Sequence, residues 1–402
     1  MRGRRRVQAA TGSRGGAALA LLCCAGLLAV AGCSVNSPGV GPGEQSQPSA
    51  SRTQPVSLSM TPGRQASHPA PGEPVTVTAE HGTITEVTLV GKDGTVVSGT
   101  LGPQATSWRA TQELGFGKTY TLRATGTNEA GRSATVSSTF TTATPASTAG
   151  VVVNVADGQT VGVGMPLVFD FTQPIPDREA AEQALTVDSE PDTVGAFHWF
   201  RDDYAVWRPK EHWQPGTTIT VNAEIYGQDL GDGVFGAQDK SFQLTVGDKV
   251  VVTADGQSHT MTVDVNGSTV KSYEISMGDA QHPTPRGVYT VMADRTDYVM
   301  SSATYGVPVD APQGYKVTVD YATRLSQGGI FFHSAPWSVW AQGERNVSHG
   351  CINMRSAAAS WLMNHTKPGD LFKVINSGGP PLQPANGWGF WQMSWDEWTA
   401  QT

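Results

Sequence analysis

Residues 328–355 of the chain read GGIFFHSAPWSVWAQGERNVSHGCINMR. The glycine pair and the apolar run 330–332 predict a turn and a buried strand, with His333 at the end of that strand. Fourteen residues separate His333 from the tetrapeptide Ser-His-Gly-Cys at 348–351. Cys351 is the last of four cysteines in the chain, and two histidines lie in the same segment. The stretch therefore predicts a strand end that presents an imidazole at a cleft, close to a thiol.

A thiol reacts as its thiolate, so a neighbouring imidazole that accepts the proton is its usual activator. Either His333 or His349 can serve as that base. His349 lies two residues before Cys351, and in an extended segment both side chains would point the same way unless Gly350 makes a turn. The N–H groups of Gly350 and Cys351 can form a donor pair for an oxyanion. The alternatives are a buried structural cysteine, hydrogen-bonded structural histidines and a simple glycine turn.

A zinc site is the other chemistry that these residue types support. His333, His349 and Cys351 would supply three ligands, but no fourth is evident, and zinc ligands usually occur in closer pairs. We therefore expect no metal and no cofactor.

The N-terminal segment has the features of an export signal. Residues 1–32 carry five arginines and an apolar run over 17–31 that is short for a membrane span, which predicts a signal peptide. The sequence Val-Ala-Gly-Cys at 30–33 resembles a bacterial lipobox, in which Cys33 would receive lipid. Residues 33–54 are then the lipidated cysteine and a disordered tether rich in Pro, Ser and Gly. An ordinary cleaved signal peptide is the alternative.

These features predict a lipid-anchored protein on the extracytoplasmic face of the cell membrane. Cys23 and Cys24 would leave with the signal peptide and Cys33 would be acylated, so Cys351 would be the single free thiol. Removal of residues 1–32 takes the formal net charge from −8 to −13, because this segment holds five arginines and no acid. Such an acidic chain argues against nucleic acid as a partner.

Residues 55–247 predict two β-sandwich domains. Short alternating runs separated by Gly, Pro, Asn and Asp are typical of antiparallel sandwiches. Residues 107–124 also align with residues 206–223 at an offset of 99, which matches Trp108 with Trp207. We therefore predict a duplicated domain, with copies at 55–146 and 149–247. Neither copy gathers a catalytic cluster, so both are expected to be spacer or docking modules.

A third unit is predicted at 248–376, followed by a Trp-rich subdomain at 377–402. The third unit begins with alternating strands and contains one helix, from Ala357 to about His365, with Ser356 as its N-cap. In the last segment four tryptophans recur at helical spacing, so we expect one helical face that packs against the third unit. Carbohydrate binding by these rings is the alternative.

The signature His333, fourteen residues, then Ser-His-Gly-Cys-Ile-Asn at 348–353 resembles that of the L,D-transpeptidases, the YkuD-type cysteine enzymes that remodel peptidoglycan. Residues 276–291, SMGDAQHPTPRGVYTV, are similar to that family's upstream element. The whole arrangement resembles that of the mycobacterial members. The resemblance implies an all-β fold of two immunoglobulin-like β-sandwich domains and a YkuD-type β-sandwich catalytic domain, with a short helix and a Trp-rich C-terminal subdomain.

The resemblance also implies a role for each motif residue. Cys351 would be the nucleophile and His333 the general base, and the Ser334 carbonyl would orient the His333 ring. Gly350 and Cys351 amides would form the oxyanion hole together with the Tyr315 hydroxyl. The remaining matched positions are the supporting residues His349 and Asn353 and the lid and substrate-cleft residues Met300, Tyr305, Tyr315, Gly329 and Trp337.

The implied reaction is formation of 3-3 cross-links between diaminopimelate residues of peptidoglycan stem peptides, with release of D-alanine. The implied partners are a tetrapeptide donor, a diaminopimelate acceptor, and carbapenem-type β-lactams as covalent inhibitors. An L,D-carboxypeptidase, or a transferase that attaches a protein to peptidoglycan, would use the same residues. A non-catalytic cell-wall-binding module is the remaining alternative.

Overall fold

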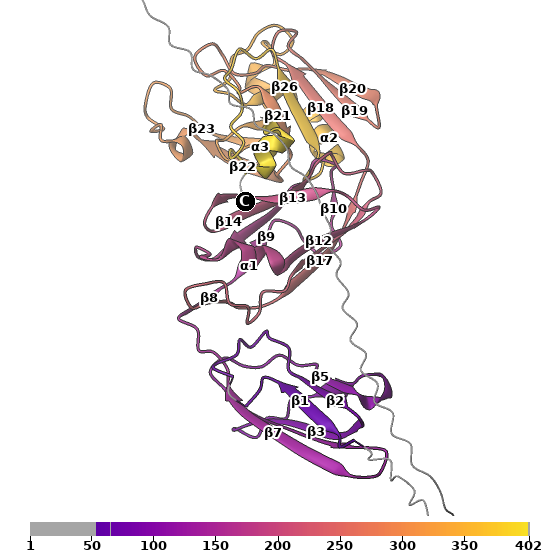
Figure 1. Ribbon diagram of the computed structural model, residues 1–402. Helices are drawn as coiled ribbons and strands as arrows, with labels where there is room; N and C mark the ends of the chain where they lie inside the picture. The colour runs from indigo at the N-terminus through magenta and orange to yellow at the C-terminus, as the bar shows by residue number, and fades with distance from the viewer. Residues whose placement is uncertain (1–53, 65, 401–402) are drawn as a thin grey trace, which may run out of the picture. The chain divides into compact units, whose positions relative to one another are not determined.

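A computed structural model describes residues 54–64 and 66–400. The predicted signal peptide, Cys33 and nearly all of the predicted tether lie outside the described residues. Strands dominate the described chain (Figure 1), so the prediction of an all-β protein with few helices is confirmed. Among these residues, none of the helices is long and apolar enough to cross a membrane.

The first sandwich has one sheet in the order β1-β2-β5-β4 and a second in the order β3-β6-β7. Both sheets contribute to one buried core, with Val77 and Trp108 from the first sheet and Leu89 and Leu122 from the second. The strands and short helix are β1 (Ser57–Thr61), β2 (Thr76–Glu80), β3 (Thr83–Gly91), β4 (Gly99–Leu101), η1 (Pro103–Ala105), β5 (Ser107–Ala110), β6 (Thr119–Thr127) and β7 (Ser133–Thr141).

The second sandwich pairs the sheet β13-β14-β11-β9 with the sheet β10-β17-β15-β12, and a two-stranded sheet joins β16 to β8. One apolar cluster takes residues from both large sheets, among them Phe169 and Val221. The elements are β8 (Ser147–Ala149), β9 (Val151–Val153), β10 (Thr160–Val161), β11 (Leu167–Phe171), α1 (Arg178–Gln183), β12 (Leu185–Glu190), β13 (Gly195–Arg201), β14 (Tyr204–Pro209), β15 (Thr218–Ala223), β16 (Val234–Gly236) and β17 (Lys240–Val246).

The two tryptophans matched in the sequence repeat occupy similar surroundings. Trp108 on β5 packs over Gly99 of the paired strand β4, where a Cβ atom would come within 2.1 Å of the indole. Trp207 on β14 packs over Gly195 of the paired strand β13, where the corresponding distance is 2.0 Å. Each indole therefore needs a residue without a Cβ beside it, which gives the repeat a physical reason.

The third unit contains two further sheets, in the orders β20-β19-β18-β26-β21 and β22-β23-β24-β25. A core between them combines Val252, Val263 and Phe372 from the first sheet with Phe332 and Ile352 from the second. The strands are β18 (Val250–Asp255), β19 (Thr260–Val265), β20 (Ser268–Glu274), β21 (Gly287–Thr290), β22 (Ala293–Ser301), β23 (Lys316–Arg324), β24 (Phe331–Ser334), β25 (Ile352–Met354) and β26 (Leu371–Ile375).

The helices of the third unit are η2 (Ser302–Tyr305), η3 (Pro336–Ser338) and α2 (Ser356–His365), and α2 buries Ala358, Ala359 and Leu362. The prediction of one helix that ends at about His365 is confirmed. Its predicted N-cap is wrong, because Ser356 is the first helical residue and Arg355 occupies the cap without a side-chain hydrogen bond.

The C-terminal tryptophans do not lie on one helix. The segment forms η4 (Phe390–Gln392) and α3 (Trp395–Thr399), with Met393 extended between them. Its indoles also pack largely against the second sandwich rather than the third unit alone: Trp398 Nε1 donates to Ala196 O at 2.9 Å, and Trp391 Nε1 donates to Gly164 O at 2.9 Å. The spacing predicted burial correctly for Trp388 and Trp398, whereas Trp391 and Trp395 are half-buried. It identified neither the break between the helices nor the packing partner.

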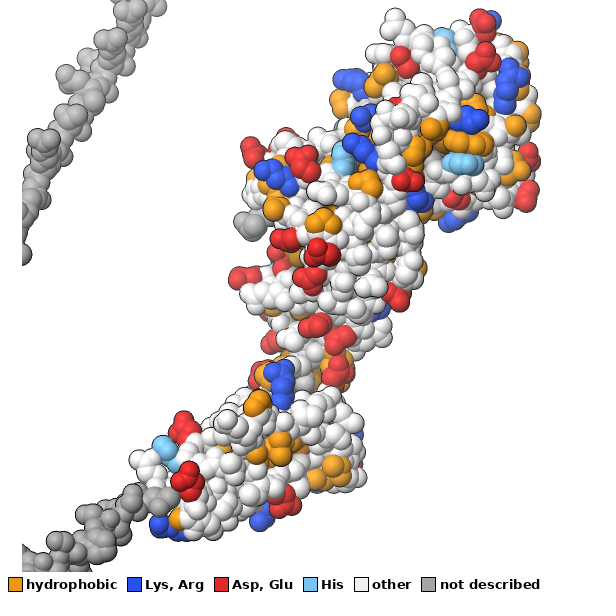
Figure 2. Space-filling model, turned by 90° about the vertical axis from the view of Figure 1, so that its right-hand side faces the viewer, with side chains coloured by type: hydrophobic (Ala, Val, Ile, Leu, Met, Phe, Trp, Pro, Cys, Tyr) orange, Lys and Arg blue, Asp and Glu red, His pale blue; other side chains and the backbone are white. Residues whose placement is uncertain are grey.

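Charge is distributed without a basic stripe on the face drawn in Figure 2, where acidic side chains are spread over the surface and basic ones lie among them. The formal net charge of the whole chain is −8.

Candidate active site

Strand pairing brings His333 and Cys351 together. β24 and β25 are parallel neighbours, and within this pair His333 lies opposite Asn353. Cys351 immediately precedes β25 (Ile352–Met354), so this pairing brings it to the end of the sheet where His333 lies. Both side chains line one cavity. The fourteen residues between His333 and Ser348 thus form the connection that returns the chain to the neighbouring strand.

That cavity has a volume of about 460 Å³, which is within the range of small-molecule sites. Cys351 and His333 lie at its base, with exposed fractions of 8% and 4%, whereas Trp337 and Trp340 are exposed at 48% and 62%. The lining contains no Asp, Glu, Lys or Arg. Its residues are Met300, Tyr315, Val317, His333, Trp337, Ser338, Trp340, Val347, Ser348, His349, Cys351 and Asn353.

Hydrogen bonds define the state of the two reactive groups. His333 Nδ1 lies 2.9 Å from Ser334 O, and because a carbonyl can only accept, Nδ1 carries the proton and Nε2 is left as the basic nitrogen. Cys351 Sγ donates to Gly329 O at 3.3 Å. Among the described residues no hydrogen bond joins Cys351 Sγ to His333, so the thiol hydrogen must leave Gly329 O before the imidazole can accept it.

Burial keeps both groups neutral. It raises the pKa of the Cys351 thiol to about 11, against a smaller opposing effect from the Phe331 backbone. It also lowers the pKa of the His333 imidazole to about 4, although the hydrogen bond to Ser334 O opposes the change. The resting site therefore holds a thiol and a neutral imidazole rather than a thiolate–imidazolium pair, and a reaction of this thiol as a nucleophile would require proton transfer.

The turn that carries Cys351 has its own hydrogen bonds. Gly350 has φ +118°, a backbone conformation that favours glycine. Its N–H donates to Ser348 Oγ at 3.0 Å, and Ser348 Oγ donates to Cys351 O at 2.6 Å. The Gly350 N–H is thus engaged within the turn and does not point unpaired into the cavity. Its predicted place in the oxyanion hole stays a prediction that requires this bond to open or to be shared.

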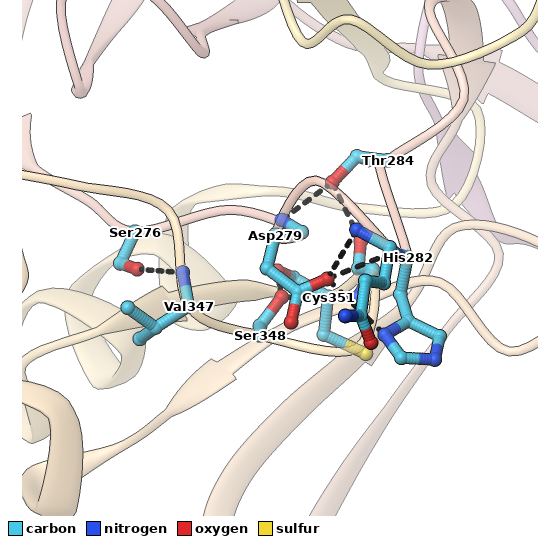
Figure 3. A network of polar contacts seen from close by, with 10 residues as sticks. Ser276, Asp279, His282, Thr284, Val347, Ser348 and Cys351 are labelled. Carbon is cyan, nitrogen blue, oxygen red and sulfur yellow. Dashed lines mark hydrogen bonds and ion pairs between the residues drawn. The ribbon is translucent and has the colours of Figure 1, made fainter.

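Residues 276–284 form a support for this turn (Figure 3). Ser348 N donates to Met277 O and Asp279 N donates to Ser348 O, both at 2.9 Å. Thr284 Oγ1 donates to Gly350 O at 2.8 Å. The segment that the family resemblance singled out as an upstream element therefore holds the turn before Cys351.

His349 also lines the cavity, but unlike Cys351 it is not buried. It is exposed, and its ring contacts those of His282, with centroids 4.7 Å apart, and Tyr315, with centroids 5.4 Å apart. His282 Nδ1 in turn lies 3.1 Å from Asp279 Oδ1. Of the two candidate bases, His333 is the one buried in the cavity with Cys351.

The other predicted cleft residues are placed as follows. Met300 is buried in the cavity lining, and the Trp337 ring stacks on His333 at 5.9 Å between centroids. Asn353 Nδ2 donates to Ser338 Oγ at 3.0 Å. Gly329 contributes the carbonyl that accepts the thiol hydrogen, a contact that its predicted place in the substrate cleft did not anticipate. Tyr305 belongs to η2, but its side chain is outside what the structure describes.

Sequence reasoning missed several lining residues, notably Trp340, Ser338 and Val347. Trp340 lies in the connection between β24 and β25, and the Arg345 guanidinium lies 5.1 Å from its ring centroid. The sequence signal that could have identified Trp340 is a tryptophan in the connection that follows the candidate base His333. Among the described residues, no group of three or more His, Cys, Asp or Glu side chains is placed to hold a metal ion.

Two family models match segments of this chain. Residues 249–375 match the family model described as the L,D-transpeptidase catalytic domain, YkuD, and residues 66–229 match the model of a bacterial Ig domain. The fold and site therefore define an enzyme with a YkuD catalytic domain and an immunoglobulin-like N-terminal region.

The relatives identify the family. L,D-transpeptidase 2 of Mycobacterium tuberculosis is 43% identical over 81% of this chain and 80% of its own length. L,D-transpeptidase 5 of the same species is 32% identical over 86% of this chain and 76% of its own length. A solved structure of an L,D-transpeptidase in complex with imipenem covers 56% of this chain and 99% of that chain, with 34% identity and a TM-score of 0.49. The chain belongs to the L,D-transpeptidase family.

The pKa values give a prediction for the pH dependence of acylation. The pKa of the His333 imidazole is lowered to about 4 and that of the Cys351 thiol is raised to about 11. Between these two pH values, both groups are therefore mainly neutral. We expect the second-order rate constant for acylation by a carbapenem to be flat from about pH 5 to about pH 10 and to halve near pH 4. Mass spectrometry of the adduct measures this rate constant at each pH, after correction for decay of the drug in the absence of protein. An acid limb centred near the ordinary histidine value, about 6.5, would contradict a buried neutral base.

Proposed function

We propose that the chain forms 3-3 cross-links between diaminopimelate residues of peptidoglycan stem peptides, through a thioester on Cys351 and with release of D-alanine. The observation that carries the proposal is that His333 on β24 and Cys351, immediately before the parallel neighbour β25, are both buried in the lining of the same cavity. Membership of the L,D-transpeptidase family supports the same reaction class.

In the first half-reaction, Cys351 Sγ attacks the carbonyl carbon of diaminopimelate in the tetrapeptide donor. His333 Nε2 accepts the thiol proton, and the carbonyl oxygen becomes an oxyanion that needs an N–H donor. The carbon–nitrogen bond to the terminal D-alanine then breaks. His333 returns its proton to the departing amine, so the base and the acid are the same residue.

In the second half-reaction, the side-chain amine of diaminopimelate in a second stem attacks the thioester. His333 accepts a proton from that amine, the carbon–sulfur bond breaks, and the proton returns to sulfur. One amide bond is exchanged for another, so the reaction needs no nucleoside triphosphate to drive amide formation. Water in place of the amine would give a tripeptide, which is the carboxypeptidase outcome.

The character of the cavity supports an amine acceptor. With no Asp, Glu, Lys or Arg in its lining, the cavity stabilises neutral groups, and an amine must give up its proton to attack. The exposed rings of Trp337 and Trp340 supply apolar surface along the entrance, over which a peptide can lie. Apolar walls also limit the access of water to a thioester at the base.

The test is incubation of the purified protein with a disaccharide-tetrapeptide, followed by mass spectrometry of the products. We expect a dimer that has lost one D-alanine. A tripeptide monomer as the only product would replace the proposal with an L,D-carboxypeptidase. Retained binding without any product would leave only a cell-wall-binding module.

We also propose that carbapenems acylate Cys351, because the strained β-lactam amide presents a carbonyl carbon to the same nucleophile. The relative solved in complex with imipenem motivates the choice of drug for the assay. The measurable result is a mass increase equal to that of the opened drug.

Finally, we propose that lipid on Cys33 anchors the protein to the outer face of the cytoplasmic membrane. The lipobox-like sequence before Cys33 and the tether that follows it support this location. Peptide mass analysis of the mature N-terminus tests the proposal, since an unmodified N-terminus at another residue would indicate an ordinary cleaved signal peptide.

A further inference from the structure

Thr284 lies outside the cavity, yet it is bonded to the turn that carries Cys351. Its side chain is fully buried. Its hydroxyl accepts from Gly278 N at 3.0 Å and donates to Gly350 O at 2.8 Å, so both of its hydrogen-bonding functions are used. Figure 3 shows the Thr284 side chain and the Cys351 sulfur on opposite sides of this turn. The hydroxyl therefore contacts the backbone behind the nucleophile and not the nucleophile itself.

The bond to Gly350 O controls the orientation of a whole peptide plane. In a trans peptide the C=O and the N–H point in opposite directions. The carbonyl of Gly350 and the N–H of Cys351 belong to the same plane, so a carbonyl held toward Thr284 directs the Cys351 N–H away from Thr284. Among the described residues the Cys351 N–H has no hydrogen-bond partner. It is available to an acyl oxygen in the cavity that Cys351 lines.

The other predicted oxyanion donor is already engaged. Gly350 N donates to Ser348 Oγ, so of the two predicted donors the Cys351 N–H is the one left for substrate. The position of a single donor matters more than that of one among several, because a hydrogen bond weakens steeply as its angle departs from linearity. A side chain that fixes this peptide plane should therefore affect the stability of an oxyanion.

Without the hydroxyl the plane would have little to hold it. Gly350 has φ +118°, in a region where glycine has unusual freedom. The peptide before Gly350 is held by the bond from its N–H to Ser348 Oγ, and the peptide after it is held by the bond from Thr284 to Gly350 O. Gly278 approaches so closely that a Cβ there would lie 3.0 Å from Gly350 Cα. The Thr284 hydroxyl bridges these two backbone segments at the point of closest approach.

We propose that Thr284 is a positioning residue for acyl transfer: by holding the Gly350 carbonyl, it aims the Cys351 N–H at the oxyanion that forms when Cys351 attacks. This inference rests on the proposed acyl-enzyme chemistry and assigns a residue to it that touches neither substrate nor sulfur. The group it serves is the carbonyl oxygen of an amide or β-lactam donor.

The experiment compares Thr284→Val, which keeps the shape and loses the hydroxyl, with Thr284→Ser, which keeps the hydroxyl. Loss of one oxyanion donor slows acyl transfer about 100- to 1000-fold, so a misaimed donor should slow it about 10- to 100-fold. We expect that loss in the second-order rate constant for acylation by a carbapenem in Thr284→Val. Thr284→Ser should stay within about threefold of the unchanged protein, since it restores the bond.

A second reaction separates positioning from general damage. Alkylation of Cys351 by iodoacetamide displaces iodide at a tetrahedral carbon and forms no oxyanion. Thr284→Val should be alkylated within about twofold of the unchanged rate. Thermal unfolding of each variant verifies the fold. If the Thr284→Val variant does not fold, Thr284→Ala replaces it in the comparison.

Two outcomes would overturn the proposal. Acylation of the hydroxyl-free variant at the unchanged rate would remove any role for Thr284, and an equal loss in acylation and alkylation would mean that Thr284 only maintains the site's shape. Neither reagent requires a stem peptide. The result therefore stands apart from the cross-linking assay, whose failure would concern the natural substrate alone.

Discussion

Cys351→Ala is expected to abolish both the cross-linked product and the carbapenem adduct. A methyl group cannot attack a carbonyl, and no other cysteine remains in the chain after residue 33. The loss should reach the detection limit of mass spectrometry, because a covalent intermediate cannot form without its nucleophile. The assay is incubation with the drug and, separately, with disaccharide-tetrapeptide.

The fold should survive this change. Cys351 is buried in a small apolar cluster with Met300, Val319, Ala322 and Phe331, so the loss of one sulfur atom costs about 1 kcal/mol of unfolding free energy. A matched control is Trp340→Ala, whose side chain is exposed in the same cavity and which should retain the adduct. An adduct on the alanine variant of Cys351 would assign the nucleophile to another residue.

The sequence predicted which residues share the cavity better than it predicted how they are brought together. The residue types at 333 and 351 indicated a candidate base and a thiol, and the apolar run before His333 predicted a strand end. Their proximity depends on pairing between β24 and β25, in parallel register, across a connection whose course no local pattern describes. The family signature supplied the information that local physics could not.

The missed details are those that depend on backbone direction. The glycine at 350 signalled a turn, but only the structure shows that its N–H donates to Ser348 Oγ and that its carbonyl accepts from Thr284. The same limit applies to the C-terminal tryptophans. Their helical spacing predicted burial on one helix, but the helical conformation is interrupted at Met393. Periodicity indicates which side chains are buried, but the segment that packs against them depends on the tertiary structure.

His333→Ala should slow acylation at neutral pH about 100- to 10000-fold, the range typical for loss of a general base. Burial raises the pKa of the Cys351 thiol to about 11, so without a base only a small fraction of the site, about one part in 10000 at pH 7, holds a thiolate. The variant should then gain about tenfold in rate for each unit of rising pH, whereas the unchanged protein stays flat over the same range. Acylation rates from pH 6 to pH 10 measure this difference.

The control is His349→Ala, which removes the second candidate base. His349 is exposed, with its ring against His282 and Tyr315, whereas His333 and Cys351 are buried. Its loss should leave the flat pH profile intact and change the rate by less than about tenfold. If the two profiles were exchanged, with the steep dependence in His349→Ala and a normal rate in His333→Ala, the base would be His349.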